Sequence, residues 1–142
     1  DADVAGLAEM RFGAGRGQGG TVLMLTIGTG IGSALFIDGQ LVPNTELGHL
    51  EVRGKEAERR ASSAAKDRKD ISWSDWAKLL AEVIERIDAL IWPDLVIIGG
   101  GVSKESQKFI PQLNARARCV PAVLHNEAGI VGAALLAAEA AA

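Results

Sequence analysis

The chain has 142 residues, enough for one compact domain and too few for two of ordinary size. Apolar residues make up 48% and charged residues 23% of the sequence, a balance that favours a folded chain over a disordered one. The formal net charge of -3 excludes a general attraction to nucleic acid or to an anionic membrane surface. We therefore expect a cytoplasmic protein with neither nucleic acid nor a membrane as its partner.

The first third of the chain predicts a helix, a glycine-rich loop and an antiparallel meander. Apolar residues recur at helical spacing from Asp1 to Phe12, and five glycines between positions 13 and 20 then break the pattern. Asp38-Gly39 is a strong hairpin signal between two β-prone runs. The three expected strands are residues 21–27, 33–37 and 40–43.

The middle of the chain contains a charged stretch followed by an amphipathic helix. Residues 51–70 include seven basic and five acidic side chains, which predicts a solvated loop or an exposed helix with a local charge of +2. Apolar residues at helical spacing predict a helix from Trp73 to Trp92, which Pro93 ends. Either Ser72 or Ser74 is expected to cap its start.

The last third alternates strands and helices. A buried strand, Asp94 to Ile98, enters three glycines, and Ser103 is expected to cap a helix that runs to about Arg118. A short apolar strand at 119–124 and an alanine-rich helix at 129–142 complete the chain. The whole order predicts an α/β fold in which helices flank a mixed five-stranded sheet.

Two glycine-rich turns are candidate phosphate sites. Thr26, Gly28, Thr29 and Gly30 follow a predicted strand, where glycine N–H groups and hydroxyls can surround a phosphate, although an ordinary hairpin turn explains the same pattern. The second turn offers Gly100, Gly101 and Lys104 at the expected start of a helix, whose free N–H groups favour anions. A tight turn with a solvated lysine is its alternative.

Further candidates are three side chains between positions 46 and 58 and two aspartates at the start of the chain. Glu46, His49 and Glu58 suit the hydroxyls of a polyol, although a charged surface loop would look the same. No metal ligand is expected, because no partner stands at ligand spacing from His49. Asp1 and Asp3 are expected to cap a helix unless the fold brings one of them to a substrate.

Taken together, these segments resemble the ROK family of sugar kinases, most closely its bacterial polyphosphate glucokinase branch. The matching segments are Asp1-Ala2-Asp3 for the end of the Asn-Asp-Ala element, residues 26–32 for the second phosphate loop, Glu46-Leu47-Gly48-His49 for the Glu-x-Gly-His sugar element, residues 95–104 for the nucleotide-side turn and residues 126–134 for the start of the closing helix. The resemblance implies the actin-like, ribonuclease H-like fold of hexokinases. It spans essentially the whole chain.

The sequence departs from the family pattern at two places. Residues 51–71 replace the cysteine cluster that binds structural zinc in most members, so zinc is not expected, and the polyphosphate-using branch lacks that cluster too. No segment matches the Asp-x-Gly-x-Thr loop of the N-terminal lobe. We therefore expect residues 1–142 to be the C-terminal lobe of such a kinase.

The resemblance implies transfer of a phosphoryl group from polyphosphate or ATP to the 6-hydroxyl of glucose, with Mg²⁺. Asp1 would be the general base, while Glu46, His49 and Glu58 would hold the sugar. We expect the basic residues of positions 53–69 to contact the polymeric donor, and we expect a homodimer. Two alternatives remain open: the sugar-sensing domain of a ROK-type transcription repressor, and a fragment that is inactive alone.

Overall fold

The computed structural model describes residues 2–125 and 128–141; Asp1, Asn126, Glu127 and Ala142 lie outside the described residues. In chain order the elements are α1 (Ala2–Phe12), β1 (Thr21–Ile27), β2 (Ile31–Ile37), β3 (Gln40–Val42), η1 (Leu47–His49), β4 (Glu51–Val52), β5 (Lys55–Glu56), α2 (Ala57–Ala61), α3 (Ser63–Lys69), α4 (Trp73–Ile91), β6 (Leu95–Gly99), η2 (Gly101–Lys108), η3 (Ile110–Gln112), β7 (Arg118–Pro121) and α5 (Ala128–Ala141). No helix in these ranges is both long and apolar enough to cross a membrane.

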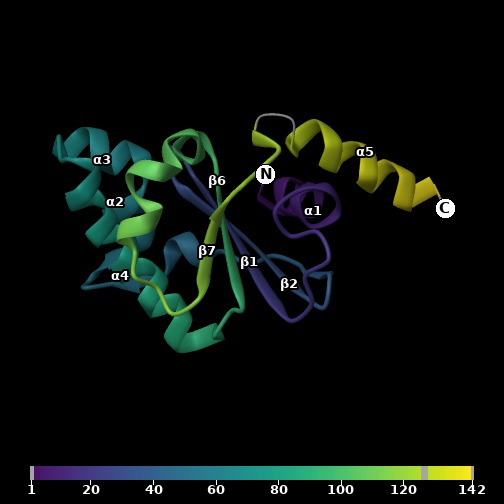
Figure 1. The fold of residues 1–142 in the computed structure, drawn as a ribbon, viewed down its shortest axis with the longest axis horizontal. Helices are drawn as coiled ribbons and strands as arrows, with labels where there is room; N and C mark the ends of the chain where they lie inside the picture. The colour runs from purple at the N-terminus through teal and green to yellow at the C-terminus, as the bar shows by residue number, and fades with distance from the viewer. Residues whose placement is uncertain (1, 126–127, 142) are drawn as a thin grey trace.

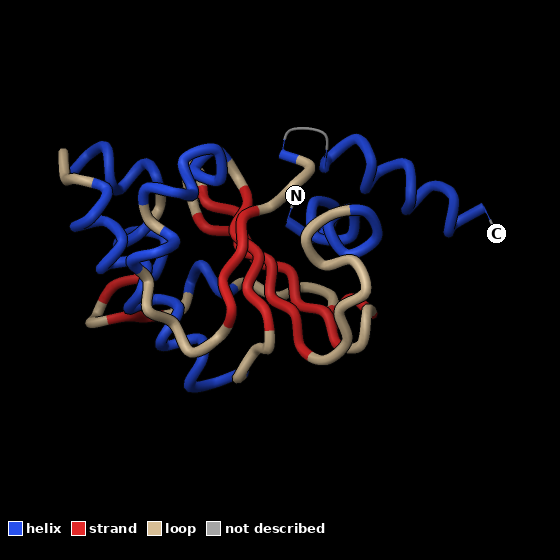
Figure 2. The backbone as a smooth tube through the Cα atoms, in the orientation of Figure 1, coloured by secondary structure: helices blue, strands red, loops and turns tan. Residues whose placement is uncertain are grey.

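A five-stranded mixed sheet forms the centre of the fold, as the sequence predicts (Figure 2). Its strand order is β3-β2-β1-β6-β7, with β1, β2 and β3 antiparallel and β1, β6 and β7 parallel. The expected turn is present between β2 and β3, where Asp38 has φ 50° and Gly39 has φ 81°. Positive φ at both central residues is the geometry that a two-residue hairpin requires.

Helices cover both faces of this sheet, with α2, α3 and α4 on one side and α1 on the other (Figure 1). The alternation of side chains along each strand supplies an apolar surface to both layers. From β1, for example, Leu25 contributes to the cluster beneath α4, whereas Met24 contributes to the cluster beneath α1. The outer helix α5 crosses α1 at Gly132, where an added methyl group would collide with the Val4 carbonyl.

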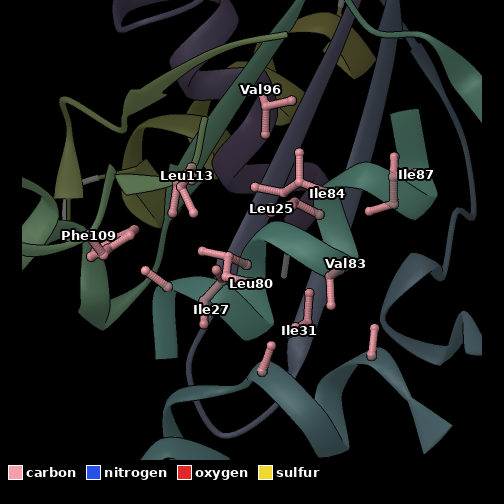
Figure 3. Close-up of a cluster of buried hydrophobic side chains, with 14 of the residues drawn as sticks. Leu25, Ile27, Ile31, Leu80, Val83, Ile84, Ile87, Val96, Phe109 and Leu113 are labelled. Carbon is pink, nitrogen blue, oxygen red and sulfur yellow. The ribbon is translucent and has the colours of Figure 1, made fainter. Parts of the chain in front are cut away.

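The larger core lies between the sheet and α4. Leu80, Val83 and Ile84 of this helix pack toward Leu25 and Val96 of the sheet (Figure 3). The helix begins as predicted, since the Ser72 hydroxyl accepts a hydrogen bond from the Asp75 N–H at 3.0 Å. Buried Trp76 donates from Nε1 to the Ala61 carbonyl at 3.1 Å, which fixes α2 against α4.

The expected helix from Ser103 to Arg118 is absent, and this prediction was wrong. Two short 3-10 helices, η2 and η3, occupy the segment instead, with a non-helical residue at Glu105. Pro111 lacks the N–H that an α-helix would need there, so a continuous α-helix cannot pass this position. Ser103 does not cap a helix; its hydroxyl donates to the Gly100 carbonyl at 2.8 Å.

The charged stretch is more ordered than the sequence suggests. It forms the β4–β5 hairpin and the helices α2 and α3, and its alanines provide the apolar face: Ala57, Ala61 and Ala65 are fully buried. Because alanine is small, this face carries no strong hydrophobic signal in the sequence. Arg53 and Arg59 are exposed, whereas the Arg60 side chain is only 15% exposed and pairs with Glu82, so only part of the stretch is solvated.

Candidate functional site

The two glycine-rich turns meet at one edge of the sheet. Because β1 and β6 are parallel neighbours, both strands end at that edge, where ligands commonly bind in α/β proteins. Residues 26–32, Glu58 and Gly100 line a hollow there of about 410 Å³. The predicted turn is shorter than expected, because Ile31 and Gly32 already belong to β2 and pair with Ile27 and Thr26.

Backbone contacts hold the first turn in place. The Gly28 carbonyl accepts hydrogen bonds from both the N–H and the hydroxyl of Ser63, each at 2.9 Å. A side chain at Gly30 would begin 2.6 Å from Glu58 Oε2, so the Glu58 carboxylate would have to move away from the turn. The turn is therefore fixed by α3 and α2, which sequence reasoning did not connect with it.

The second turn contributes one of its three candidate residues to this hollow. Gly100 has φ 84°, and a side chain there would overlap the backbone of Ile27. Gly101 does not line the hollow. Lys104 lies apart, at a second hollow of about 470 Å³, where the Ser103 hydroxyl is 3.2 Å from His125 Nδ1.

The η1 turn positions Glu46 and His49. The Ser33 hydroxyl accepts the Leu47 N–H at 3.0 Å, and a side chain at Gly48 would collide with the Ile31 carbonyl, so η1 is pressed against β2. Glu46 lines a hollow of about 340 Å³ with Asp3 and Gly32, and Gly32 also borders the hollow at the glycine turn. The predicted base, Asp1, lies outside the described residues.

Glu58 connects His49 with the glycine turn. Its Oε2 atom accepts the Ile31 N–H at 3.2 Å, and its Oε1 atom lies 3.8 Å from His49 Nδ1. A second carboxylate, which the sequence did not indicate, lies nearer: Glu56 Oε1 is 3.5 Å from the same nitrogen. His49, Glu56 and Glu58 each offer a potential metal-ligand atom within 4.8 Å of the others. The fold thus places next to His49 two carboxylates that the spacing in the sequence did not indicate as its partners.

A larger basic hollow of about 840 Å³ adjoins His49. Its cationic lining residues are Lys55, Arg59, Arg68 and Lys69. Partial burial, together with the positive charges of Arg60, Lys55 and Arg68, lowers the pKa of Lys69. Arg60 itself is held by Glu82 at 2.6 Å. A local positive field is thus present on a chain whose net charge is negative.

Similarity to known proteins agrees with the resemblance seen in the sequence. No protein-family model matches the chain. The polyphosphate glucokinase of Mycobacterium tuberculosis is 56% identical over 135 residues, which cover 95% of this chain and 51% of that protein. The chain thus spans about half the length of such curated relatives.

Solved structures give the same result for the fold. The inorganic polyphosphate/ATP-glucomannokinase of Arthrobacter sp. strain KM superposes with a TM-score of 0.95 at 54% identity, over 97% of this chain and 55% of that one. A ROK family glucokinase from Streptomyces griseus, solved with glucose and AMPPNP, superposes with a TM-score of 0.70 at 25% identity, over 96% and 66% of the two chains. The chain therefore has the fold of ROK-family hexokinases. Within that class it is a homologue of polyphosphate glucokinases over about half of their length.

Proposed function

We propose that the protein carrying this chain transfers a phosphoryl group from polyphosphate or ATP to the 6-hydroxyl of glucose. The observation that carries the proposal is the 56% identity to a polyphosphate glucokinase across 95% of the chain. The meeting of the glycine turn, Gly100 and Glu58 at one sheet edge supports it. The fold alone does not separate a kinase from a sugar-sensing regulator. The relative of high identity is a kinase, so we favour the enzyme.

In this proposal the chain binds and orients the sugar and the phosphoryl donor, and it forms no covalent intermediate with either. Backbone N–H groups of Thr29 and Gly30 and the hydroxyls of Thr26 and Thr29 donate to phosphate oxygens of the donor. Gly28 lines the same hollow, but its N–H already donates to the Gly30 carbonyl at 3.0 Å. The sugar hydroxyls are held by Glu46, His49 and Glu58. Phosphoryl transfer gains mainly from positioning and charge stabilisation, and a base, assigned to Asp1, takes the hydroxyl proton.

The described residues around the glycine turn do not form a magnesium site by themselves. Mg²⁺ prefers several oxygen ligands in octahedral geometry. Within residues 2–125 and 128–141, the only carboxylate bordering this hollow is Glu58, whose Oε2 atom already accepts the Ile31 N–H. Mg²⁺ remains an expectation for the whole protein, and no step above depends on it. Gly101 and Lys104 are assigned to a more distal part of the donor, because Lys104 borders the neighbouring hollow.

The proposal also includes the place of this chain in the protein. We assign residues 1–142 to the C-terminal lobe, with 51–71 as an insert, in agreement with coverage of 51% of the relative. We expect the protein to be a homodimer in the cytoplasm. Sedimentation measures the oligomeric state, and cell fractionation measures the location.

The test is a coupled assay for glucose 6-phosphate with the full-length protein, using polyphosphate and ATP as separate donors and glucose and mannose as separate acceptors. Formation of the sugar phosphate with either donor is expected. Binding of glucose without turnover would instead favour the sugar-sensing alternative.

A further inference from the structure

The imidazole of His49 has two different surroundings at its two nitrogens. Nδ1 faces carboxylate oxygens of Glu56 and Glu58 at 3.5 Å and 3.8 Å. Nε2 has no hydrogen-bond partner within the described ranges, and the side chain is 57% exposed. In a neutral histidine, the hydrogen bond made by one nitrogen decides which nitrogen carries the proton. The carboxylates therefore favour the proton on Nδ1.

Glu56 is better suited than Glu58 to accept that proton's hydrogen bond. Its Oε1 atom is the nearer of the two, and its Oε2 atom lies 3.5 Å from Arg59 Nε, which orients the carboxylate. Glu58 is committed elsewhere, because its Oε2 atom accepts the Ile31 N–H beside the glycine turn. Arg59 also neutralises part of the charge on Glu56, so a bound cation is not needed to balance it.

Apart from the ion pair with Arg59, the Glu56 side chain has no polar interaction among the described residues other than its contact with His49. Glu56 ends β5 and precedes α2, but its side chain makes no capping hydrogen bond at that helix. It is 42% exposed and contributes nothing to the buried core. A substitution at this position can therefore report on His49 without unfolding the hairpin.

We propose that Glu56 is a positioning residue for His49, resting on the function proposed above. Its carboxylate accepts a hydrogen bond from Nδ1–H, which leaves Nε2 unprotonated as an acceptor for a sugar hydroxyl. The 3.5 Å separation is long for a hydrogen bond, but such contacts in ligand-free sites often tighten when substrate binds. Glu58 then stays available to both the sugar and the glycine turn.

The direct test is nuclear magnetic resonance of the full-length protein labelled with ¹⁵N-histidine. Ring nitrogen shifts recorded over a pH series distinguish the two neutral tautomers of a histidine from its protonated form. We expect the Nδ1–H form in the unsubstituted protein and a shift toward Nε2–H in Glu56→Ala. Glu51→Gln is the matched control, because Glu51 pairs with Glu56 across the hairpin and borders the same hollow. It should leave the tautomer unchanged.

Kinetics separate positioning from a general effect on folding. Glu56→Ala should raise the glucose KM or lower kcat by about 10- to 100-fold, the range for losing a group that orients a histidine. It should not raise the KM of ATP or of polyphosphate, because Glu56 borders the basic hollow and its loss removes a negative charge there. Glu56→Gln keeps an acceptor oxygen and should restore most of the activity. An equal rise in both KM values would contradict the assignment.

Two spectroscopic outcomes would overturn the proposal. One is an Nε2–H tautomer in the unsubstituted protein, or a tautomer that Glu56→Ala leaves unaltered. The other is a change of the His49 nitrogen shifts on adding a chelator, which would show that a metal ion holds Nδ1. A protein that phosphorylates no sugar would defeat the proposed function instead, while the tautomer measurement would still decide the contact.

Discussion

Glu9 and Val123 lie 114 positions apart, yet Glu9 Oε1 accepts a hydrogen bond from the Val123 N–H at 2.9 Å. The same oxygen accepts the Leu124 N–H at 2.8 Å, and Oε2 accepts the Ala14 N–H at 2.8 Å. Glu9 is fully buried in α1, so its carboxylate satisfies three backbone donors away from water. This one side chain ties the first helix to the segment that follows β7.

We predict that Glu9→Gln destabilises the fold at this junction. The glutamine oxygen can still accept hydrogen bonds, but the NH₂ group faces the Ala14 N–H, and two donors cannot bond to each other. The expected loss of unfolding free energy is about 1 to 3 kcal/mol. Denaturant unfolding measures this loss, and the amides of Val123 and Leu124 should lose protection in hydrogen exchange. Glu85→Gln, at an exposed position of α4, is the control. Equal stability of the two variants would contradict the prediction.

The second prediction assigns the general base. In the full-length enzyme, Asp1→Asn should lower kcat by about 10²- to 10⁴-fold, the usual cost of a lost base, and leave glucose binding intact. Asp3→Asn should cost far less, because Asp3 is in the first turn of α1, where a carboxylate suits the helix dipole. Steady-state kinetics and glucose titrations measure both, and similar kcat values for the two variants would refute the assignment.

The third prediction concerns the polymeric donor. The sequence suggested the basic residues of positions 53–69. Among them, Arg60 is paired with Glu82, and Lys66 lies 4.6 Å from the centre of the Trp73 ring. Replacing Arg68 and Lys69 with alanine should raise the polyphosphate KM more than the ATP KM. The effect should weaken as salt rises, because neutralising a polyanion releases counterions.

A double variant of Arg16 and Arg86 removes the same charge from positions outside the basic hollow and serves as the control. If the Arg16 and Arg86 variant raises the polyphosphate KM as much as the Arg68 and Lys69 variant does, the effect is one of net charge alone. Equal effects of the Arg68 and Lys69 changes on both donors would also discard the basic hollow as a donor site.

The fourth prediction follows from Cys119, which is a partly buried free thiol. Burial, with a smaller contribution from the Asp88 charge, raises its pKa from 9.0 to about 11. At about pH 8 the thiolate is therefore about 100-fold scarcer than in the unfolded chain, and alkylation should slow accordingly. Mass spectrometry of iodoacetamide labelling, with and without denaturant, gives the two rates.

The same shift fixes the sign of a pH effect on stability. Between about pH 9 and pH 11 the folded chain binds more protons at Cys119 than the unfolded chain does, so the unfolding free energy falls as pH rises through this window. Cys119→Ala should remove that component of the pH dependence. A native thiol that reacts as fast as the denatured one would show that burial does not protect it.

The sequence by itself determined the elements whose signals are local. Asp38-Gly39 specified the turn between two β-prone runs, and the apolar spacing from Trp73 to Trp92, with Ser72 and Pro93 at its ends, specified α4. Such features depend on backbone propensity and on side-chain period over a few residues. The resemblance to sugar kinases likewise rests on short segments that can be read one by one.

The tertiary structure alone decided which of these segments touch. No periodic pattern in the sequence connects Gly100 with Ile27, Ser63 with the Gly28 carbonyl, or His49 with Glu56. The fold nevertheless brings the two members of each pair together. Such contacts depend on how strands align in a sheet and how helices dock on it, so a single exposed carboxylate carries no signal in the sequence. The failed helix after Ser103 has a related cause, because the helix signal there was weaker than the break that Pro111 imposes on the backbone.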